Sequence, residues 1–474
     1  MYSGVLTSSI YILQFITYPY VARVLGVSNI GICNFVQSIV NYFLLFSMLG
    51  INTLGVREIA KCNGDQEKLN QTFSRLFTLN AISTLVVLLV YLVSIELIPQ
   101  FTVYRKLLYI GAVQILFNLF TVEWLFRGLE NFRYVTLRTM VIRVCYVLAI
   151  FLLVKESDDY SVYFIISVAM VVANGIVNWL YRRKLVRFRL PSFSSIKLYF
   201  RPFLFLGSQV ILTSMYTTFN VAYLGFVSND TEVGYYTTAT KIEQIIMVLY
   251  SSFTVVMMPR VSALIEQSKQ EEVNRLIIKS LKLLCAFAVP IIIFSEIFAE
   301  EIVFLVGGIG YEGAVMPMRI VMPLLLIIGI EQILIVQLLV PARADKEVFL
   351  NSVIGAGVGI ALNILLVPHW QSVGSAVVWS VAELSVLLCA YYFIRKRFRQ
   401  IKISGVLTSY IMYFIPLILI LGFKYVFAFS WLVNLLIAGV LTVLYSHIVL
   451  YYFIKDEVYR SSIKLLLKHM HIRG

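Results

Sequence analysis

Charged residues are scarce in this chain, and acidic ones are scarcest: 14% of its 474 residues are charged, with 25 Asp and Glu against 39 Lys and Arg. The polar connections between apolar stretches reach only about twenty residues, which is too short for an independent soluble core. The sequence lacks the Gly-x-x-x-x-Gly-Lys-Ser/Thr phosphate loop and the His-Glu-x-x-His pair, so the parts for ATP hydrolysis and zinc proteolysis are missing. Its five cysteines are scattered and mostly within apolar stretches, which is typical of apolar fillers and not of a disulfide framework.

Long apolar stretches are what the chain has in abundance, since 60% of its residues are hydrophobic. A stretch of about 20 residues spans the hydrocarbon core of a bilayer. No cleavable signal is evident, and we expect the first span to serve as a signal-anchor. We predict an all-α membrane protein with about fourteen spans, near residues 3–25, 31–55, 76–98, 107–126, 139–154, 161–181, 202–227, 235–258, 283–305, 319–341, 349–367, 373–394, 406–428 and 431–454.

The basic residues are distributed unevenly between these spans. Of the 39 Lys and Arg, 32 lie on alternate connections and on the C-terminal tail. Short loops rich in Lys and Arg stay in the cytoplasm, so this pattern predicts that both termini are cytoplasmic. The net charge of +14 is thereby explained by topology, and no nucleic-acid partner is expected.

The most basic connection, residues 182–201, predicts a boundary between two six-helix lobes, 1–181 and 202–394. Residues 395–474 would then form two extra membrane helices and a basic cytoplasmic tail. The two halves resemble each other weakly: an arginine follows Gly31 and Gly234 by 26 residues in each case, at Arg57 and Arg260. Parallel repeats of this kind are a transporter architecture with the substrate site between the repeats.

Charges inside spans are the candidate functional residues, because an Arg, Lys or Asp at a helix centre costs about 2.5–3.5 kcal/mol. Lys241 lies about two turns into its predicted span, roughly 10 Å deep. Its helix stripe carries Thr237, Gln244, Ser251 and Ser252, which favours a water-lined lumen. A buried ion pair, or a lysine that snorkels outward, is the alternative.

Other candidates lie at helix ends or within spans. Arg143 and Arg23 are predicted to bind substrate with Lys241, whereas Arg57 and Arg260 at the inner mouth could equally be ordinary topology anchors. Glu331 and Glu383, near the middle of their spans, are either a coupling-ion site or partners for a lumen cation. Cations outnumber mid-span acids, which indicates an anionic substrate; no metal or cofactor is expected.

Several segments together are similar to signature regions of bacterial polysaccharide flippases. They are residues 18–26 (YPYVARVLG), 55–60 (GVREIA), 123–133 (EWLFRGLENFR), 233–241 (VGYYTTATK), 258–260 (MPR), 363–368 (NILLVP) and 373–376 (VGSA). The chain thus resembles the Wzx-type flippases of O-antigen and capsule, within the multidrug/oligosaccharidyl-lipid/polysaccharide exporter superfamily. The likeness covers nearly the whole chain.

The resemblance implies a transporter, not an enzyme. It would move polyprenyl-diphosphate-linked oligosaccharide to the outer leaflet of the bacterial cytoplasmic membrane by alternating access. Implied partners are this substrate, membrane lipids, H⁺ or Na⁺ as coupling ion and other polysaccharide-assembly proteins. The alternatives are a drug antiporter of the same superfamily, which would want a net acidic cavity, and a membrane glycan polymerase or glycosyltransferase, which would need a sizeable outer loop.

Overall fold

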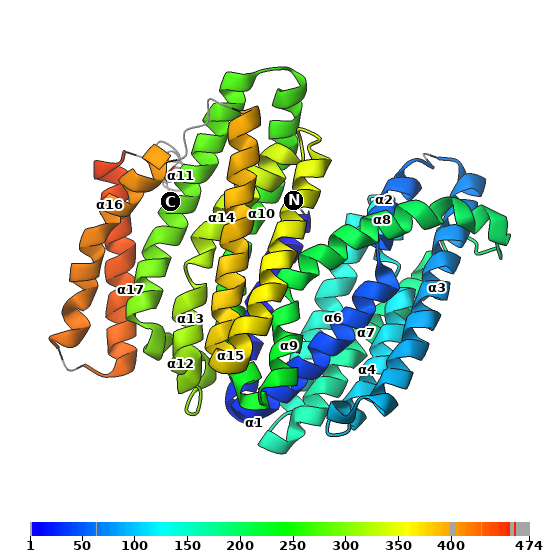
Figure 1. Cartoon of the computed structure of the whole chain (residues 1–474), viewed down its shortest axis with the longest axis horizontal. Coiled ribbons are helices and arrows are strands. Elements are labelled where there is room, and N and C mark those ends of the chain that lie inside the picture. The colour runs from blue at the N-terminus through cyan, green and yellow to red at the C-terminus, as the bar shows by residue number, and fades with distance from the viewer. Residues whose placement is uncertain (1, 63, 399–403, 428, 456–458, 461–474) are drawn as a thin grey trace, which may run out of the picture. The chain divides into compact units, whose positions relative to one another are not determined.

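The computed structural model describes residues 2–62, 64–398, 404–427, 429–455 and 459–460, with the backbone alone for 2–15 and 404. Every regular element in this part of the chain is a helix (Figure 1). The α-helices are α1 (Tyr2–Met48), α2 (Ile51–Ala60), α3 (Gln66–Leu97), α4 (Arg105–Asn118), α5 (Glu123–Gly128), α6 (Phe132–Leu153), α7 (Tyr160–Arg182), α8 (Phe193–Thr217), α9 (Phe219–Val227), α10 (Asp230–Glu266), α11 (Gln270–Ile297), α12 (Ala299–Gly307), α13 (Val315–Val321), α14 (Leu324–Leu334), α15 (Asp345–Arg397), α16 (Ser404–Leu421) and α17 (Trp431–Ile448). Short helical turns connect them: η1 (Pro99–Phe101), η2 (Leu119–Thr121), η3 (Ser157–Asp159), η4 (Glu312–Ala314), η5 (Ile335–Leu339), η6 (Gly422–Tyr425) and η7 (Val449–Phe453).

Eleven helical stretches of the described chain are long and apolar enough to cross a membrane, or up to twelve if the bent pair α8–α9 is one span. The predicted all-helical, multi-pass architecture is confirmed, but the number fourteen is not. Two helices are much longer than a bilayer is thick: α1 has 47 residues and α15 has 53. Each contains one residue with non-helical backbone angles, Gly26 in α1 and Gln371 in α15, both at positive φ.

The chain forms two compact units. The first consists of Met1–Thr237 and Gly359–Ser375, and the second of Thr238–Val358 and Ala376–Gly474. The lobes and the linker expected at 182–201 remain predictions. Most of the expected basic tail, beyond 455, lies outside the described residues.

Two of the signature segments pack against each other in the first unit, where α2 meets α5. A Cβ on Gly55 would lie 2.7 Å from the Trp124 ring, and a Cβ on Gly128 would lie 2.7 Å from Cβ of Ile59. The indole of Trp124 also stacks on Phe73, with ring centroids 5.6 Å apart, and is only 1% exposed. Glycine therefore lets the two helices approach closely around one buried aromatic side chain.

We expect replacement of Trp124 with Ala to destabilise the first unit by about 3–5 kcal/mol, because it removes a fully buried indole from between two helices. The measurement is the thermal unfolding of purified protein in detergent. Trp370→Ala is the matched control, since Trp370 is 55% exposed. Equal unfolding midpoints for the two variants would contradict this account of the α2–α5 contact.

The glycines of the sequence repeat also lie at a helix crossing. Within the first unit, α1 meets the first turns of α10, and a Cβ on Gly31 would overlap the carbonyl oxygen of Asp230. Reciprocally, a Cβ on Gly234 would overlap the carbonyl oxygen of Val27. Two backbones thus touch at equivalent positions of the two halves, which only residues without a side chain allow.

Polar side chains fasten the same crossing. Asn34 Nδ2 donates to Thr237 Oγ1 at 2.9 Å, and the Tyr104 hydroxyl donates to Asp230 Oδ1 at 2.8 Å. Burial and the neighbouring carboxyl of Asp230 raise the pKa of Tyr104, so its hydroxyl keeps its proton as a donor. The crossing is therefore fixed by backbone contact and by hydrogen bonds.

In the second unit, α11 packs against α14, α16 and α17. An ion pair connects the last helices to this unit: Lys424 Nζ lies 2.7 Å from Glu301 Oε1 and also donates to the carbonyl of Ile297 at 3.1 Å. Both charged side chains are largely buried, at 13% and 10% exposure. Loss of either partner would leave the other charge buried and unpaired, so α16 and α17 have a specific attachment.

Candidate functional site

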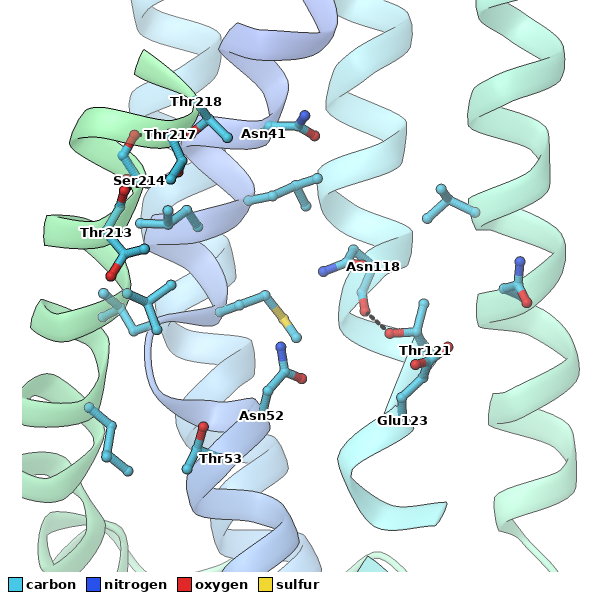
Figure 2. Close-up of a pocket in the computed structure, with 18 of the residues that line it drawn as sticks. Asn41, Asn52, Thr53, Asn118, Thr121, Glu123, Thr213, Ser214, Thr217 and Thr218 are labelled. Atoms are coloured by element: carbon cyan, nitrogen blue, oxygen red, sulfur yellow. Dashed lines mark hydrogen bonds between the residues drawn. The ribbon is translucent and has the colours of Figure 1, made fainter. Parts of the chain in front are cut away.

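The first unit contains a polar cavity of about 980 Å³ (Figure 2). Residues of α1, α2, α4, α5, α6, α7, α8 and the turn η2 line it. The lining residues are Asn41, Leu44, Leu45, Met48, Leu49, Asn52, Thr53, Asn118, Thr121, Glu123, Thr139, Arg143, Met170, Val171, Asn174, Leu206, Gln209, Val210, Thr213, Ser214, Thr217 and Thr218. We refer to this space as the polar cavity.

Amides and hydroxyls dominate the polar part of the lining. Figure 2 shows Asn41 and Asn52 on one side of the space and Asn118 and Thr121 on the other. An amide side chain offers two donors and an acceptor, and a hydroxyl offers both roles. Such a surface can hydrogen-bond a ligand that is rich in hydroxyl groups.

Only two charged residues, Glu123 and Arg143, are among these lining residues of the described chain. The Glu123 carboxylate accepts from Arg127 Nη2 at 3.2 Å and from Arg138 Nη2 at 3.1 Å, so two cations balance its charge. Arg143 is half-buried on α6. Arg143 therefore contributes a cation to the lining, and a guanidinium group suits an anionic ligand.

A local break in the helix positions Glu123. Val122, between η2 and α5, adopts φ 36° and ψ 38°, a left-handed conformation that is rare for a β-branched residue. The side chain of Asn178 on α7 donates to the carbonyl of Thr121 and accepts from the Tyr134 hydroxyl at 3.0 Å. Because the chain turns at Val122, Thr121 and Glu123 both line the cavity.

The predicted substrate cations of the first unit are placed differently from one another. Arg143 lines the polar cavity, whereas Arg23 and Arg57 do not. Arg23 is an exposed residue of α1, three positions before the break at Gly26. Arg57 is also exposed, and its Nε lies 3.1 Å from Oε1 of Glu58.

Lys241, Gln244 and Arg260 lie on the part of α10 that belongs to the second unit. Lys241 is half-buried, while Gln244 and Arg260 are exposed. One member of the predicted stripe is engaged within the unit, because Ser251 Oγ accepts from Gln332 Nε2 at 3.0 Å. The roles of these residues remain predictions.

The structure brings Glu331 of α14 and Glu383 of α15 together within the second unit. The two carboxyl groups are close enough to interact electrostatically, and Trp379 Nε1 donates to Glu383 Oε1 at 3.0 Å. Glu243 of α10, which is 1% exposed, is close enough to interact electrostatically with Glu383. Two buried carboxyl groups that lie this close together repel each other when both are charged, so a proton on one of them is favoured.

Sequence reasoning missed the amide lining and Glu243. Asn41, Asn118 and Asn174 are uncharged polar residues within apolar spans, and that was the available signal. Glu243 is itself a charge within a span, but it lies off the polar stripe of Lys241. Among the described residues, no group of three or more His, Cys, Asp or Glu is placed to hold a metal ion.

Comparison with known proteins gives consistent relatives. A protein of Escherichia coli (strain K12) named "Putative O-antigen transporter" is 27% identical over 409 residues, which are 83% of this chain and 95% of that protein. A Shigella dysenteriae protein of the same name is 25% identical over 260 residues, 54% of this chain and 64% of that protein. These relatives are named as transporters and not as enzymes.

Two solved structures share the fold. The lipid II flippase MurJ in an inward closed conformation matches with a TM-score of 0.77 at 15% identity, over 96% of this chain and 99% of that one. An inward-facing multidrug resistance transporter of the MATE family, in the MOP superfamily, matches with a TM-score of 0.61 at 16% identity, over 84% and 95%. The family model described as "Polysaccharide biosynthesis protein" matches residues 1–265, more than half of the sequence, and the chain belongs to that family.

Proposed function

We propose that this protein flips a polyprenyl-diphosphate-linked oligosaccharide from the inner to the outer leaflet of the bacterial cytoplasmic membrane. The observation that carries this proposal is the polar cavity within a unit of membrane helices, lined by amides and hydroxyls and by the guanidinium group of Arg143. The names of its relatives, O-antigen transporters, support the same substrate class.

The chemistry of the cavity suits both parts of such a head group. The sugar carries many hydroxyls, and the asparagine and threonine side chains can replace the water that these hydroxyls lose on entry. The diphosphate carries negative charge, for which Arg143 offers a planar fork of donors. The apolar prenyl chain can stay in the bilayer while the head group passes.

We further propose fourteen crossings with both termini in the cytoplasm. At 1.5 Å per residue, α1 and α15 measure about 70 and 80 Å, more than twice the hydrocarbon thickness. Each bends at one non-helical residue and so can cross twice. With the bent pair α8–α9 as one span, the total is fourteen. The protein then works by alternating access, exposing its site to one leaflet at a time.

Deleting the gene and typing the lipid-linked glycan tests the substrate. The expected result is accumulation of one undecorated lipid-linked oligosaccharide on the cytoplasmic face and loss of the surface glycan, both restored by the intact gene. Normal surface glycan in the deletion strain would refute the proposal. Loss of drug resistance with an intact glycan would favour an antiporter instead.

The carboxyl pair Glu331–Glu383 supports a proton as the coupling ion. A proton that binds between two carboxyl groups can be released when one of them moves, and Glu243 is a further acceptor beside them. We therefore place proton binding in the second unit and glycan binding in the first. Na⁺ is the alternative ion.

Glu331→Gln and Glu383→Gln are expected to lose the acceleration of flipping by a pH gradient, because an amide cannot release the proton that a carboxyl group releases. The measurement is glycolipid flipping in proteoliposomes with an imposed pH gradient or an imposed Na⁺ gradient. Glu272→Gln is the control, since the Glu272 side chain is 49% exposed. Proton coupling at Glu331 and Glu383 would be refuted if both variants kept their response to the pH gradient. It would also be refuted if the wild-type protein responded to the Na⁺ gradient alone.

A further inference from the structure

A second hollow, of about 500 Å³, lies on the other face of α6 in the first unit. We call it the α6–α7 groove. Its lining residues are Asn131, Arg133, Tyr134, Leu137, Arg138, Val141, Ile142, Val177 and Tyr181. Thr139 and Arg143 of the same helix line the polar cavity instead, so α6 separates the two spaces.

Arg138 is the unusual residue of this groove. Its side chain is only 3% exposed, and its Nη2 donates to Glu123 Oε1 and to Thr139 Oγ1, both at 3.1 Å. Its Nε and Nη1 are buried as well, and no acceptor among the described residues meets them. Leaving a buried donor unpaired costs about 1–3 kcal/mol, and more when the group is charged. The site therefore favours a ligand that supplies acceptor oxygens.

The charge around the groove is positive. Glu123 is the carboxylate that balances Arg138, and it is shared with Arg127 at 3.2 Å. Arg133, an exposed residue five positions before Arg138, adds a second cation to the lining. The lining residues, all in the described part of the chain, include no acid. Two guanidinium groups thus face the groove with one shared counter-charge behind it.

The rest of the groove is apolar. Leu137, Val141 and Val177 are 56%, 59% and 39% exposed on membrane-spanning helices. The rings of Tyr134 and Tyr181 stack at 3.7 Å between centroids. Arg133 lies near the first turn of α6, and Val141 follows eight residues later, about 12 Å along the helix. The groove is therefore cationic at one end and apolar along its length.

We propose that the α6–α7 groove binds an anionic phospholipid of the surrounding bilayer. Its phosphate accepts hydrogen bonds from Arg133 and, after a small rearrangement of the side chain, from the unpaired donors of Arg138. An acyl chain lies along Leu137 and Val141. The groove has about half the volume of the polar cavity, which favours a compact head group over one that carries a glycan.

Arg138 would connect such a lipid to the transport site. Its guanidinium contacts the groove on one side and holds Glu123, a lining residue of the polar cavity, on the other. A phosphate that pairs with Arg138 competes with Glu123 for this guanidinium group, so the negative charge of Glu123 is less well neutralised. An anionic lipid would thereby adjust the charge that the polar cavity presents, without entering it.

Lipid binding to the purified, delipidated protein tests the proposal. In native mass spectrometry, phosphatidylglycerol is expected to bind about tenfold more tightly than phosphatidylcholine. The reason is that the head group of phosphatidylglycerol carries a net negative charge, which pairs with Arg133 and Arg138, whereas that of phosphatidylcholine is neutral overall. Arg133→Gln and Arg138→Gln should each remove about that preference. Arg127→Gln is the matched control, since Arg127 contacts the same Glu123 but does not line the groove.

Several outcomes would overturn the proposal. Equal binding of the two phospholipids, or an unchanged preference in Arg133→Gln, refutes it even if Arg138→Gln fails to fold. If inorganic phosphate bound to the groove as tightly as phosphatidylglycerol does, the groove would be a site for small anions and not for a lipid. Displacement of phosphatidylglycerol by a trace of prenyl diphosphate would identify the groove as a substrate site instead. None of these readouts depends on flipping activity, so the proposed transport function can stand or fall separately.

Discussion

Arg143→Ala is expected to reduce glycan export by about 30-fold or more while leaving protein level and membrane insertion normal. Arg143 is the cation among the residues that line the polar cavity, and the acid there is already balanced by Arg127 and Arg138. Removing one partner of a desolvated charge pair costs about 2–5 kcal/mol, which corresponds to the expected loss. The measurement is surface glycan in a deletion strain that carries each variant.

A series of substitutions separates charge from structure. Arg143→Lys should keep part of the activity, since a point charge replaces a planar fork, and Arg143→Glu should keep none. Lys241→Ala is expected to lose export as well, because we propose that Lys241 on α10 also contacts the anionic substrate. Arg75→Ala is the control: Arg75 is a partly buried arginine of α3 outside the polar cavity. Normal export by Arg143→Ala and Lys241→Ala would end the hypothesis of a cationic lumen.

Much of the architecture was predictable because bilayer physics acts on local composition. Apolar length depends on the sequence alone, and it predicted helices where the structure has them. The distribution of Lys and Arg predicts the orientation of the chain, which remains a prediction. The number of crossings was harder to establish, because α15 is one continuous helical stretch in the structure, whereas the sequence predicts two spans there, 349–367 and 373–394, on either side of the break at Gln371. A count of long apolar helices therefore treats α15 as one span, whereas a count that divides it at the backbone break gives two.

The site was only partly predictable. Charged residues in spans are rare and costly, so Arg143, Glu331 and Glu383 stood out, and the structure brings the last two close together. An asparagine is cheap enough to occur as ordinary packing, and its direction depends on which face its helix buries. The lining by Asn41 and Asn118 therefore needed the fold. The turn at Val122, which positions Glu123, leaves no trace in composition.

The two glycines of the sequence repeat have a structural role that the sequence alone did not show. In the sequence, Gly31 and Gly234 stand out only because each precedes an arginine by the same 26 residues. In the structure they lie at one crossing of α1 and α10, each against a backbone carbonyl of the opposite helix. A requirement for close backbone approach explains why both positions lack a side chain.

Gly31→Ala and Gly234→Ala are therefore expected to be among the most damaging small substitutions in the chain. In each case the new Cβ would overlap a carbonyl oxygen, that of Asp230 or that of Val27, and a backbone cannot swing aside as a flexible side chain can. The helices must separate, which breaks the Asn34–Thr237 hydrogen bond at the same crossing. We expect a loss of about 3 kcal/mol or more for each variant.

The thermal unfolding midpoint of purified protein, with the yield of monodisperse protein on size exclusion, measures the effect. Gly357→Ala is the matched control, because its Cβ would have nothing within 4 Å and alanine favours the helix. Since both glycines serve one crossing, the double variant should lose less than the sum of the two single losses. If both alanine variants unfold at the midpoint of the control, the helices are not held at this distance. The repeat would then have no structural role at Gly31 and Gly234.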